Sequence, residues 1–126
     1  MPDTMSTYRT ITPYFTVPDA DGELTFLKAA FGATEVGVQR NPDQTIGHAE
    51  IKIGDSLVML GQCSPQWGTH TGAIYLWVED VDGTYAKALA AGATSESAPE
   101  DKPYGHRNAG VVDRNGITWW IGAPVK

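Results

Sequence analysis

The sequence is poor in cysteine and in long apolar runs. Its 126 residues include a single cysteine, Cys63, so the chain can form no internal disulfide and no cysteine-based metal cluster. No apolar run approaches the ~20 residues that span a bilayer, and residues 1–7 are polar and loose, without the basic and apolar segments of an export signal. We therefore expect a cytoplasmic protein in which Cys63 is an incidental thiol and not a reactive one.

Positive charge is also scarce. Nine Lys and Arg residues against fifteen Asp and Glu residues give a net charge of −6. A chain without a basic stripe has no electrostatic means of holding a phosphate backbone, so we expect no nucleic-acid partner, and no membrane partner either. The acidic balance mainly favours solubility, but it is also compatible with a cationic small ligand.

Motifs for phosphate binding and for nucleophilic catalysis are missing. The sequence has no Gly-rich phosphate loop and no nucleophile elbow. Asp19, Asp21, Asp80 and Asp82 directly precede or open expected helices, where carboxylates cap the helix and favour its dipole. Glu50 is left as a possible general base, provided that a cavity desolvates it.

What the chain does contain is a duplication. Residues 17–22 and 78–83 share the pattern Val-x-Asp-x-Asp-Gly at an offset of 61 residues, and the Gly-Ala-Thr that closes each following helix recurs at an offset of 60. Gly47-His48 likewise recurs as Gly105-His106. Because the offset is half the chain, we expect two copies of one module and not a solenoid.

Hydrophobic periodicity predicts a strand, a helix and three more strands in each module. Seven of these strands have expected bounds, over residues 7–17, 34–40, 47–53, 57–60, 73–78, 107–112 and 117–121. The first helix is capped by Asp19 or Asp21 and ends at Gly32, and the second covers residues 80–91. Residues 95–104 are expected as a polar, Pro-containing loop. Module one is thus 8–61, the linker 62–72 and module two 73–122.

The doubled module, its aspartates before each helix and the pattern Asp-x-x-Gly-x-x-Trp-x-Ile of residues 113–121 resemble the vicinal oxygen chelate superfamily. This superfamily includes glyoxalase I, extradiol dioxygenases and bleomycin-resistance proteins, and the sequence looks closest to its small bleomycin-resistance-like members. The resemblance covers Tyr8 to Gly122. It implies an α+β fold in which two tandem βαβββ modules form curled mixed sheets around a cavity, with the helices outside. It also implies a homodimer, in which modules can be exchanged between chains.

The enzymes of this superfamily hold a divalent metal with two side chains from each module. Placed on the shared landmarks, the four positions are Thr12, Met59, Ala73 and Trp120. Ala and Trp cannot ligate a metal, Met is too soft for the ions concerned, and a lone Thr hydroxyl is a weak ligand. The resemblance therefore implies a protein without the family's metal site and without a cofactor.

A different metal site stays open. His48 and Glu50 share one face of an expected strand, and His70 or His106 could complete a site with them. The simpler interpretation is that His48 and Glu50 are the solvated face of a sheet.

On this fold, the strand face opposite the helices lines the cavity. The candidate ligand-binding residues are the aromatic, sulfur-containing and polar side chains on that face or at its rim: Tyr14, His48, Glu50, Met59, Trp67, Tyr75, Trp77, Tyr104, Arg107 and Trp120. Such a lining suits a flat, partly apolar ligand. The alternative is that these side chains simply fill a small barrel. Arg107 binds an anionic group or pairs with Asp113 or Glu100, and Trp119 packs under a helix.

The missing metal ligands, the aromatic lining and the acidic charge favour a metal-free, dimeric small-molecule-binding protein. The bleomycin-resistance-like members imply sequestration of an antibiotic, and we expect a planar aromatic or cationic drug, either a peptide or a polycyclic aromatic compound. One alternative is a lyase or isomerase of the glyoxalase type, or a dioxygenase-like enzyme, with an atypical metal site. The other is a structural or regulatory dimer whose cavity is filled.

Overall fold

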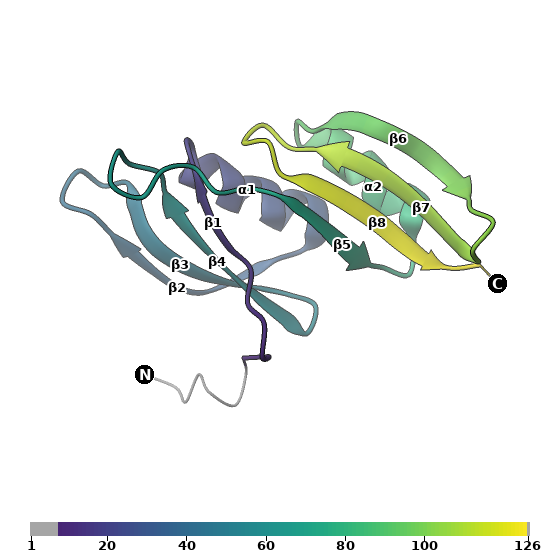
Figure 1. The fold of residues 1–126 in the computed structure, drawn as a ribbon, viewed down its shortest axis with the longest axis horizontal. Helices are drawn as coiled ribbons and strands as arrows, with labels where there is room; N and C mark the ends of the chain where they lie inside the picture. The colour runs from purple at the N-terminus through teal and green to yellow at the C-terminus, as the bar shows by residue number, and fades with distance from the viewer. Residues whose placement is uncertain (1–7, 126) are drawn as a thin grey trace.

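Two modules of the same topology lie side by side in the computed structural model, which describes residues 8–125 (Figure 1). The segment 1–7, predicted to be loose, lies outside the described residues. Module one contains β1 (Tyr14–Val17), α1 (Ala20–Phe31), β2 (Thr34–Arg40), β3 (Ile46–Ile53) and β4 (Ser56–Gln62). Module two contains β5 (Ala73–Trp77), α2 (Val81–Ala90), β6 (Thr94–Asp101), β7 (His106–Val112) and β8 (Thr118–Pro124). Residues 63–72 connect them.

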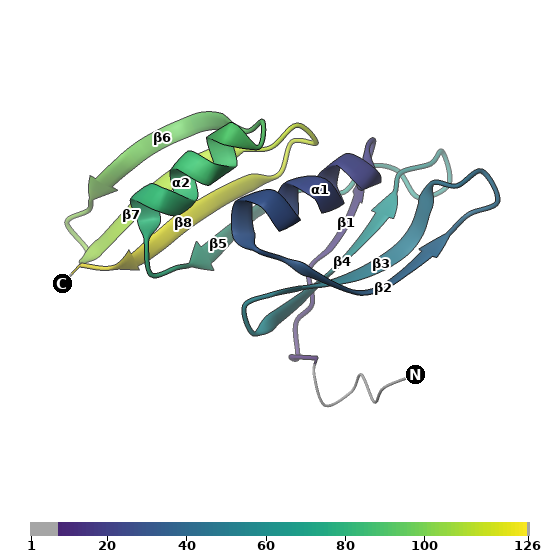
Figure 2. The ribbon, with the colours of Figure 1, turned by 180° about the vertical axis from the view of Figure 1, so that it is seen from behind.

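Each module forms one mixed four-stranded sheet, with the strand order β1-β4-β3-β2 in one and β5-β8-β7-β6 in the other. The opening strand pairs in parallel with the closing strand, and the other pairs are antiparallel. Both helices lie on the same side of the molecule, so the other face of each sheet is free of helices (Figures 1 and 2). The predicted α+β fold of two βαβββ modules is confirmed. Neither helix found in residues 8–125 combines the length and the apolar character needed to cross a lipid bilayer.

Strand β1 is shorter than the strand expected over residues 7–17. It begins at Tyr14, directly after Pro13. Proline has no amide hydrogen to donate to a sheet ladder, although the Pro13 carbonyl still accepts a hydrogen bond from the Met59 amide at 2.8 Å. The ladder with β4 therefore starts one residue after the proline.

The prediction of a loop over residues 95–104 is wrong for residues 95–101, because Thr94–Asp101 forms β6. This strand lies at the edge of its sheet and pairs only with β7, with breaks in register on either side of Ser97. An edge strand tolerates proline and polar side chains that a central strand would exclude. Its polar composition and Pro99 are therefore consistent with a strand at this position.

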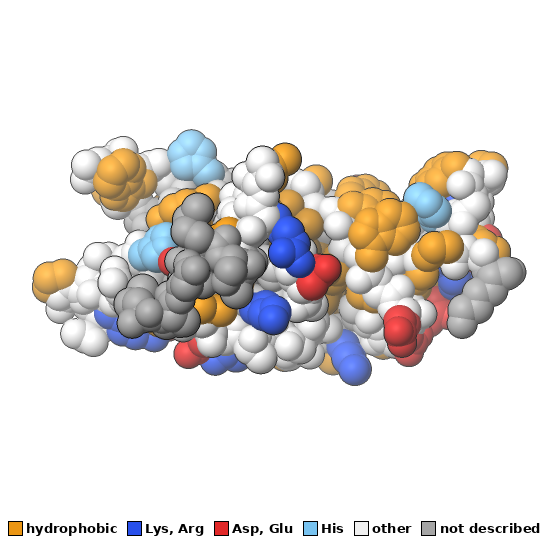
Figure 3. All heavy atoms as spheres, turned by 90° about the horizontal axis from the view of Figure 1, so that it is seen from below, with side chains coloured by type: hydrophobic (Ala, Val, Ile, Leu, Met, Phe, Trp, Pro, Cys, Tyr) orange, Lys and Arg blue, Asp and Glu red, His pale blue; other side chains and the backbone are white. Residues whose placement is uncertain are grey.

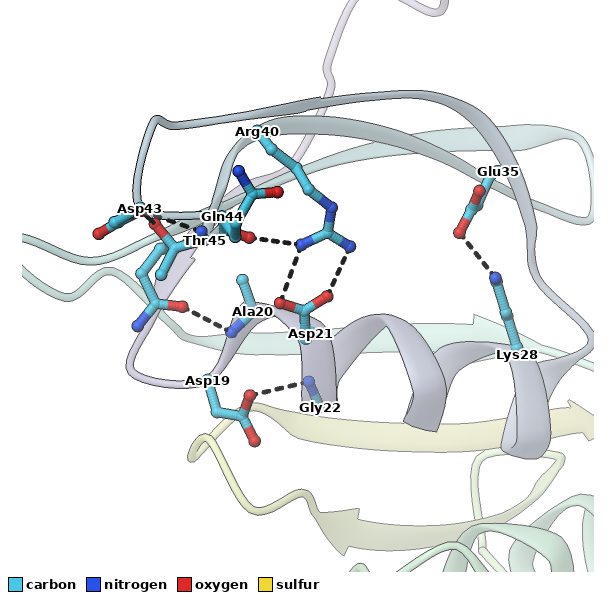
Figure 4. Close-up of polar contacts among 11 residues, drawn as sticks. Asp19, Ala20, Asp21, Gly22, Lys28, Glu35, Arg40, Asp43, Gln44 and Thr45 are labelled. Carbon is cyan, nitrogen blue, oxygen red and sulfur yellow. Dashed lines mark hydrogen bonds and ion pairs between the residues drawn. The ribbon is translucent and has the colours of Figure 1, made fainter.

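Asp19 and Asp80 cap the two helices in the same way. Each carboxylate accepts a hydrogen bond of 2.9 Å from the backbone amide three residues later. Asp21, the other cap left open by the sequence, instead pairs with Arg40 of β2 at 2.8 Å, and the guanidinium lowers the pKa of that carboxyl (Figure 4). Gly32 ends α1 at a φ of 67°, a conformation that favours glycine.

Trp119 closes the apolar core at the junction of the modules. Its side chain is fully buried, as predicted, and contacts Phe15 of β1 and Phe31 of α1 at ring-centroid distances of 6.1 and 5.0 Å. Its indole N–H donates to Asp113 Oδ2 at 2.9 Å. One residue of module two thus packs on two elements of module one.

A buried carboxyl group lies at the same junction. Glu23 of α1 is 1% exposed, and its Oε1 accepts a hydrogen bond of 3.0 Å from Asn115 in the β7–β8 turn. Asn115 also exchanges two hydrogen bonds with the backbone of Asp19. Burial, together with the adjacent Asp113, raises the pKa of Glu23 to about 9. Glu23 is therefore a neutral acid at neutral pH and can donate its proton to Asp113.

Candidate functional site

Two large aromatic side chains lie flat on the helix-free face of module two. Tyr75 of β5 and Trp120 of β8 are partners in the parallel ladder. Each covers a glycine of a neighbouring strand: a Cβ at Gly110 would lie 2.6 Å from the Trp120 ring, and a Cβ at Gly122 would collide with the Tyr75 hydroxyl. The two glycines let the rings lie against the sheet and form the floor of the site.

Three more rings gather beside Tyr75, and we call Tyr75, Trp77, Tyr104 and His106 the aromatic cluster. Trp77 lies 4.8 Å from both Tyr75 and His106, measured between ring centroids, and meets His106 edge to face. Tyr104, from the β6–β7 loop, meets His106 edge to face at 5.3 Å. Trp77 is 57% exposed and Tyr104 63% exposed. Viewed from below, hydrophobic side chains gather beside a histidine at the right of the molecule, where module two lies (Figure 3). The cluster therefore presents aromatic surface to solvent.

Asn108 of β7 supports the cluster from within. Its Nδ2 donates to the Tyr104 hydroxyl at 2.9 Å and to the Tyr75 hydroxyl at 3.3 Å. The Tyr75 hydroxyl also lies 3.4 Å from His106 Nδ1. One buried amide thus fixes two rings of the cluster, while its own Oδ1 is buried without a hydrogen-bond partner.

The equivalent face of module one is polar, and we call Tyr14, His48 and Glu50 the polar triad. The Tyr14 hydroxyl lies 3.1 Å from His48 Nδ1, and His48 Nε2 lies 3.2 Å from Glu50 Oε2. The Tyr8 hydroxyl donates to Glu50 Oε1, and this hydrogen bond, with burial, raises the pKa of Tyr8 to about 12. Met59 of β4 pairs with Glu50 in the antiparallel ladder. This face offers a carboxylate and an imidazole, whereas module two offers rings.

The ten candidate residues of the sequence divide into these two faces, with two exceptions. Within residues 8–125, no hydrogen bond or ring contact joins the polar triad to the aromatic cluster. Trp67 lies in the 63–72 loop, 63% exposed, with its amide bonded to Ser64 Oγ. Arg107 lies on the opposite side of β7 from Asn108, where it pairs with Asp82 at 2.9 Å and Asp101 at 3.1 Å.

The partners expected for Arg107, Asp113 and Glu100, are therefore wrong. Its neighbours in β7 alternate between the two faces, and the odd-numbered Ala109 and Val111 belong to the buried core on the side where α2 packs. Arg107 consequently meets the first turn of α2 and the end of β6, and its role in binding a ligand stays a prediction.

Sequence reasoning missed Asn108, and it considered His106 only as a metal ligand. The repeat carried a signal for His106, because Gly47-His48 recurs as Gly105-His106. Asn108 follows two residues later in the same strand. Strand alternation then places both on the face of Tyr75.

A hollow of about 750 Å³ lies between the modules next to the aromatic cluster. Tyr75 and Trp77 form part of its wall, together with Ile11, Phe31 and Leu57. Ile11 is 82% exposed. The hollow therefore extends the exposed apolar surface from the cluster towards module one.

The side chains of the described residues assemble no evident metal centre. Across residues 8–125, no three His, Cys, Asp or Glu side chains come close enough to share one ion. Tyr14, and not Thr12, pairs with Met59. His70 bonds to the Trp67 carbonyl, so it does not join His48 and Glu50. That the protein binds no metal stays a prediction for direct metal analysis.

The sheet pairing, the helix positions and the two symmetric faces define a vicinal oxygen chelate fold. The chain belongs to the Glyoxalase/Bleomycin resistance protein/Dioxygenase superfamily, whose family model matches residues 10–121. The predicted family is thereby confirmed. Curated relatives include uncharacterised proteins of Mycobacterium bovis and Mycobacterium tuberculosis, each 35% identical over 92% of this chain and over 84% and 75% of their own lengths.

Solved structures share the fold. The crystal structure of TioX from a Micromonospora species is 27% identical, with a TM-score of 0.77, over 93% of this chain and 99% of TioX. A family enzyme from Burkholderia phytofirmans is 20% identical, with a TM-score of 0.72, over 91% of this chain and 96% of its own. A glyoxalase I mutant from maize is 18% identical, with a TM-score of 0.75, over 94% of this chain and 45% of its own. The last two similarities show the fold alone.

Proposed function

We propose that this protein binds a planar aromatic small molecule on the aromatic cluster, without a metal, and acts by sequestering it. The observation that carries the proposal is the exposure of Trp77 and Tyr104 beside Tyr75 and His106 on a sheet face that no helix covers. Exposed rings gathered at one place are typical of a binding surface, whereas single exposed rings are not. Sequestration requires only affinity, so no group has to stabilise a transition state.

The geometry of the cluster suits stacking. Trp77 is held by ring contacts with Tyr75 and His106 and keeps more than half of its surface free. A ring already held in place loses little freedom when a ligand arrives. One stacked pair adds about 0.5–1.5 kcal/mol beyond the burial of area. Two or three such contacts support micromolar binding together with the apolar area that they bury.

The ligand class that we propose is a peptide or polycyclic aromatic antibiotic, bound in the cytoplasm. The bleomycin-resistance members named in the family description support this choice. The net charge of −6 and the carboxylate of the polar triad favour a ligand that carries positive charge. A second copy of the chain would cover the open faces and form a homodimer.

Tryptophan fluorescence tests the proposal on protein first assayed for metals. We expect saturable quenching by a bleomycin-type, quinoxaline-type or mitomycin-type antibiotic at micromolar concentration, with no metal bound. Trp77→Leu should weaken binding about tenfold, the worth of one lost stacking contact. Trp67→Leu is the matched control, because it removes a similarly exposed indole from the segment 63–72 that connects the modules. Equal effects of the two substitutions would contradict the proposed site.

A second function is favoured by the polar triad. His48 is held between Glu50 and Tyr14, an arrangement that orients an imidazole for proton transfer. This geometry supports a lyase or isomerase of the glyoxalase type. Stoichiometric zinc, nickel, iron or manganese in the purified protein, or turnover of a substrate that His48→Gln abolishes, would make the enzyme the better proposal.

A further inference from the structure

Asn108 is buried beneath the aromatic cluster with an incomplete set of hydrogen-bond partners. The residue is 3% exposed, its Nδ2 donates to two tyrosine hydroxyls, and its Oδ1 receives no donor. Among the side chains of residues 8–125, one other buried atom is in this state, Oε2 of Glu23. Glu23 can bind a proton and donate it to Asp113, but an amide does not titrate. The spare acceptor of Asn108 therefore needs another explanation.

The Tyr104 side chain, which covers Asn108 from the β6–β7 turn, makes few contacts. Tyr104 lies in the tight β6–β7 turn, where Gly105 has a φ of 91° and Lys102 pairs with His106 through the backbone. The Tyr104 side chain is 63% exposed and is fixed by one hydrogen bond to Asn108 and one ring edge on His106. It can turn into solvent without disturbing the core. The Asn108 amide would then lie open beside Tyr75.

We propose that Asn108 is the polar anchor of the ligand site, and that it binds a carboxamide or lactam edge of the planar ligand once Tyr104 has turned aside. Nδ2 then donates to the ligand carbonyl, and Oδ1 accepts from the ligand N–H. These two antiparallel hydrogen bonds match both ends of the amide and use the acceptor that has no partner in the free protein. The inference rests on the proposed function and adds the chemical class of the ligand.

The equivalent position of module one does not offer this recognition. In the register of the two sheets, His48 is the counterpart of Asn108. Its two ring nitrogens already lie within hydrogen-bond distance of Tyr14 and Glu50, so they leave no free donor and acceptor for the two ends of a ligand amide. The duplicated fold thus carries one amide anchor, in the module that also carries the rings.

Two probes of nearly equal shape test the anchor in the full chain. 2-Naphthamide carries the amide edge, and 2-isopropenylnaphthalene replaces it with an apolar group. If the site offered no hydrogen-bond partner, 2-naphthamide would bind more weakly than the apolar probe, because its amide loses its hydration on entering the site. Because Asn108 provides that partner, we expect 2-naphthamide to bind at least tenfold more tightly than the apolar probe in calorimetric titrations. In NMR spectra of ¹⁵N-labelled protein, the Asn108 side-chain NH₂ signals should shift with 2-naphthamide alone.

Two substitutions test the roles of Asn108 and Tyr104 separately. Asn108→Leu should abolish the preference for 2-naphthamide but leave the affinity for 2-isopropenylnaphthalene unchanged. Tyr104→Phe keeps the ring but removes the hydrogen bond that competes with the ligand, so it should strengthen 2-naphthamide binding several-fold. Tyr104→Phe alters an exposed side chain and should fold normally. The NMR measurement uses the unsubstituted protein, so the proposal can be tested even if Asn108→Leu does not fold.

The outcomes separate the two proposals. Equal binding of both probes, with the Asn108 NH₂ signals unmoved, would overturn the anchor and leave ring binding at the cluster standing. Binding of neither probe would overturn both. An unchanged or weaker affinity for 2-naphthamide in Tyr104→Phe would show that the Tyr104 hydroxyl is not displaced, and so overturn the anchor.

Discussion

At the scale of single residues, the site depends on what is missing as much as on what is present. Tyr75 and Trp120 lie flat because Gly122 and Gly110 have no side chains. The backbone of Gly122 is not in the left-handed region, so alanine is acceptable there on conformational grounds. Only the ring above it excludes a methyl group.

We therefore expect Gly122→Ala to displace Tyr75 and to weaken binding of the quenching ligand about tenfold or more. The stability cost should be that of modest overpacking, about 1–3 kcal/mol, because the colliding group is the end of a movable side chain. Ligand titration and urea unfolding of the same sample measure both effects. Gly37→Ala is the control, since a Cβ there meets no atom within 4 Å. Full affinity in Gly122→Ala would show that the position of Tyr75 does not matter.

At the scale of elements, the helices begin where the sequence says they should. Asp80 is the N-cap of α2, with its carboxylate on the Gly83 amide, while Asp82 in the first turn pairs with Arg107 in solvent. The two aspartates are two residues apart and carry the same charge. Their energetic roles differ, because one satisfies a helix amide and the other forms an exposed ion pair.

Asp80→Ala should lower the free energy of unfolding by about 1 kcal/mol, the usual worth of a cap. Asp82→Ala should lower it by about 0.5 kcal/mol or less, because exposed ion pairs contribute little and Arg107 keeps Asp101. Denaturant unfolding curves measure both values. The assignment of Asp80 as the cap fails if Asp82→Ala is the more destabilising of the two.

At the scale of the whole molecule, the protonated carboxyl group of Glu23 lies at the contact between the two modules. It connects α1 with the turn that carries Asp113 and Asn115, and a second hollow at this place is lined by Asp19 and Arg114. Its pKa rises from the ordinary 4.5 to about 9 on folding. Between these pH values the folded protein binds a proton that the unfolded chain lacks, so the contribution of Glu23 to stability is complete below pH 4.5 and is lost as pH rises towards 9.

Glu23→Gln should remove this dependence, because glutamine presents a donor to Asp113 without binding a proton. The stability of the variant relative to the unsubstituted protein should be greater at pH 8.5 than at pH 5, by at least about 1.4 kcal/mol, the worth of one pKa unit. Urea unfolding at the two pH values measures the difference. Glu35→Gln, which alters an exposed carboxyl paired with Lys28, is the control. Parallel pH profiles for Glu23→Gln and the unsubstituted protein would contradict a protonated Glu23.

The sequence by itself determined the duplicated module, the family, the aspartates at which each helix begins, and the stop at Gly32, although it left the first cap open between Asp19 and Asp21. These are local properties, since a cap, a turn glycine and an alternating strand each depend on a few neighbouring residues, and the repeat shows them twice. It also placed Tyr75, Trp77 and Trp120 on one face, because strand alternation has a period of two.

Only the tertiary structure decided which distant groups meet. The polar segment of β6 became a strand because β7 lies beside it, and Arg107 found Asp82 and Asp101 because α2 packs on that face. Glu23 is neutral because another module buries it, and Asn108 anchors two rings that arrive from β5 and from a loop. Hydrogen bonds and burial between segments far apart in the chain leave no pattern among neighbouring residues. These contacts could therefore be identified only from the tertiary structure.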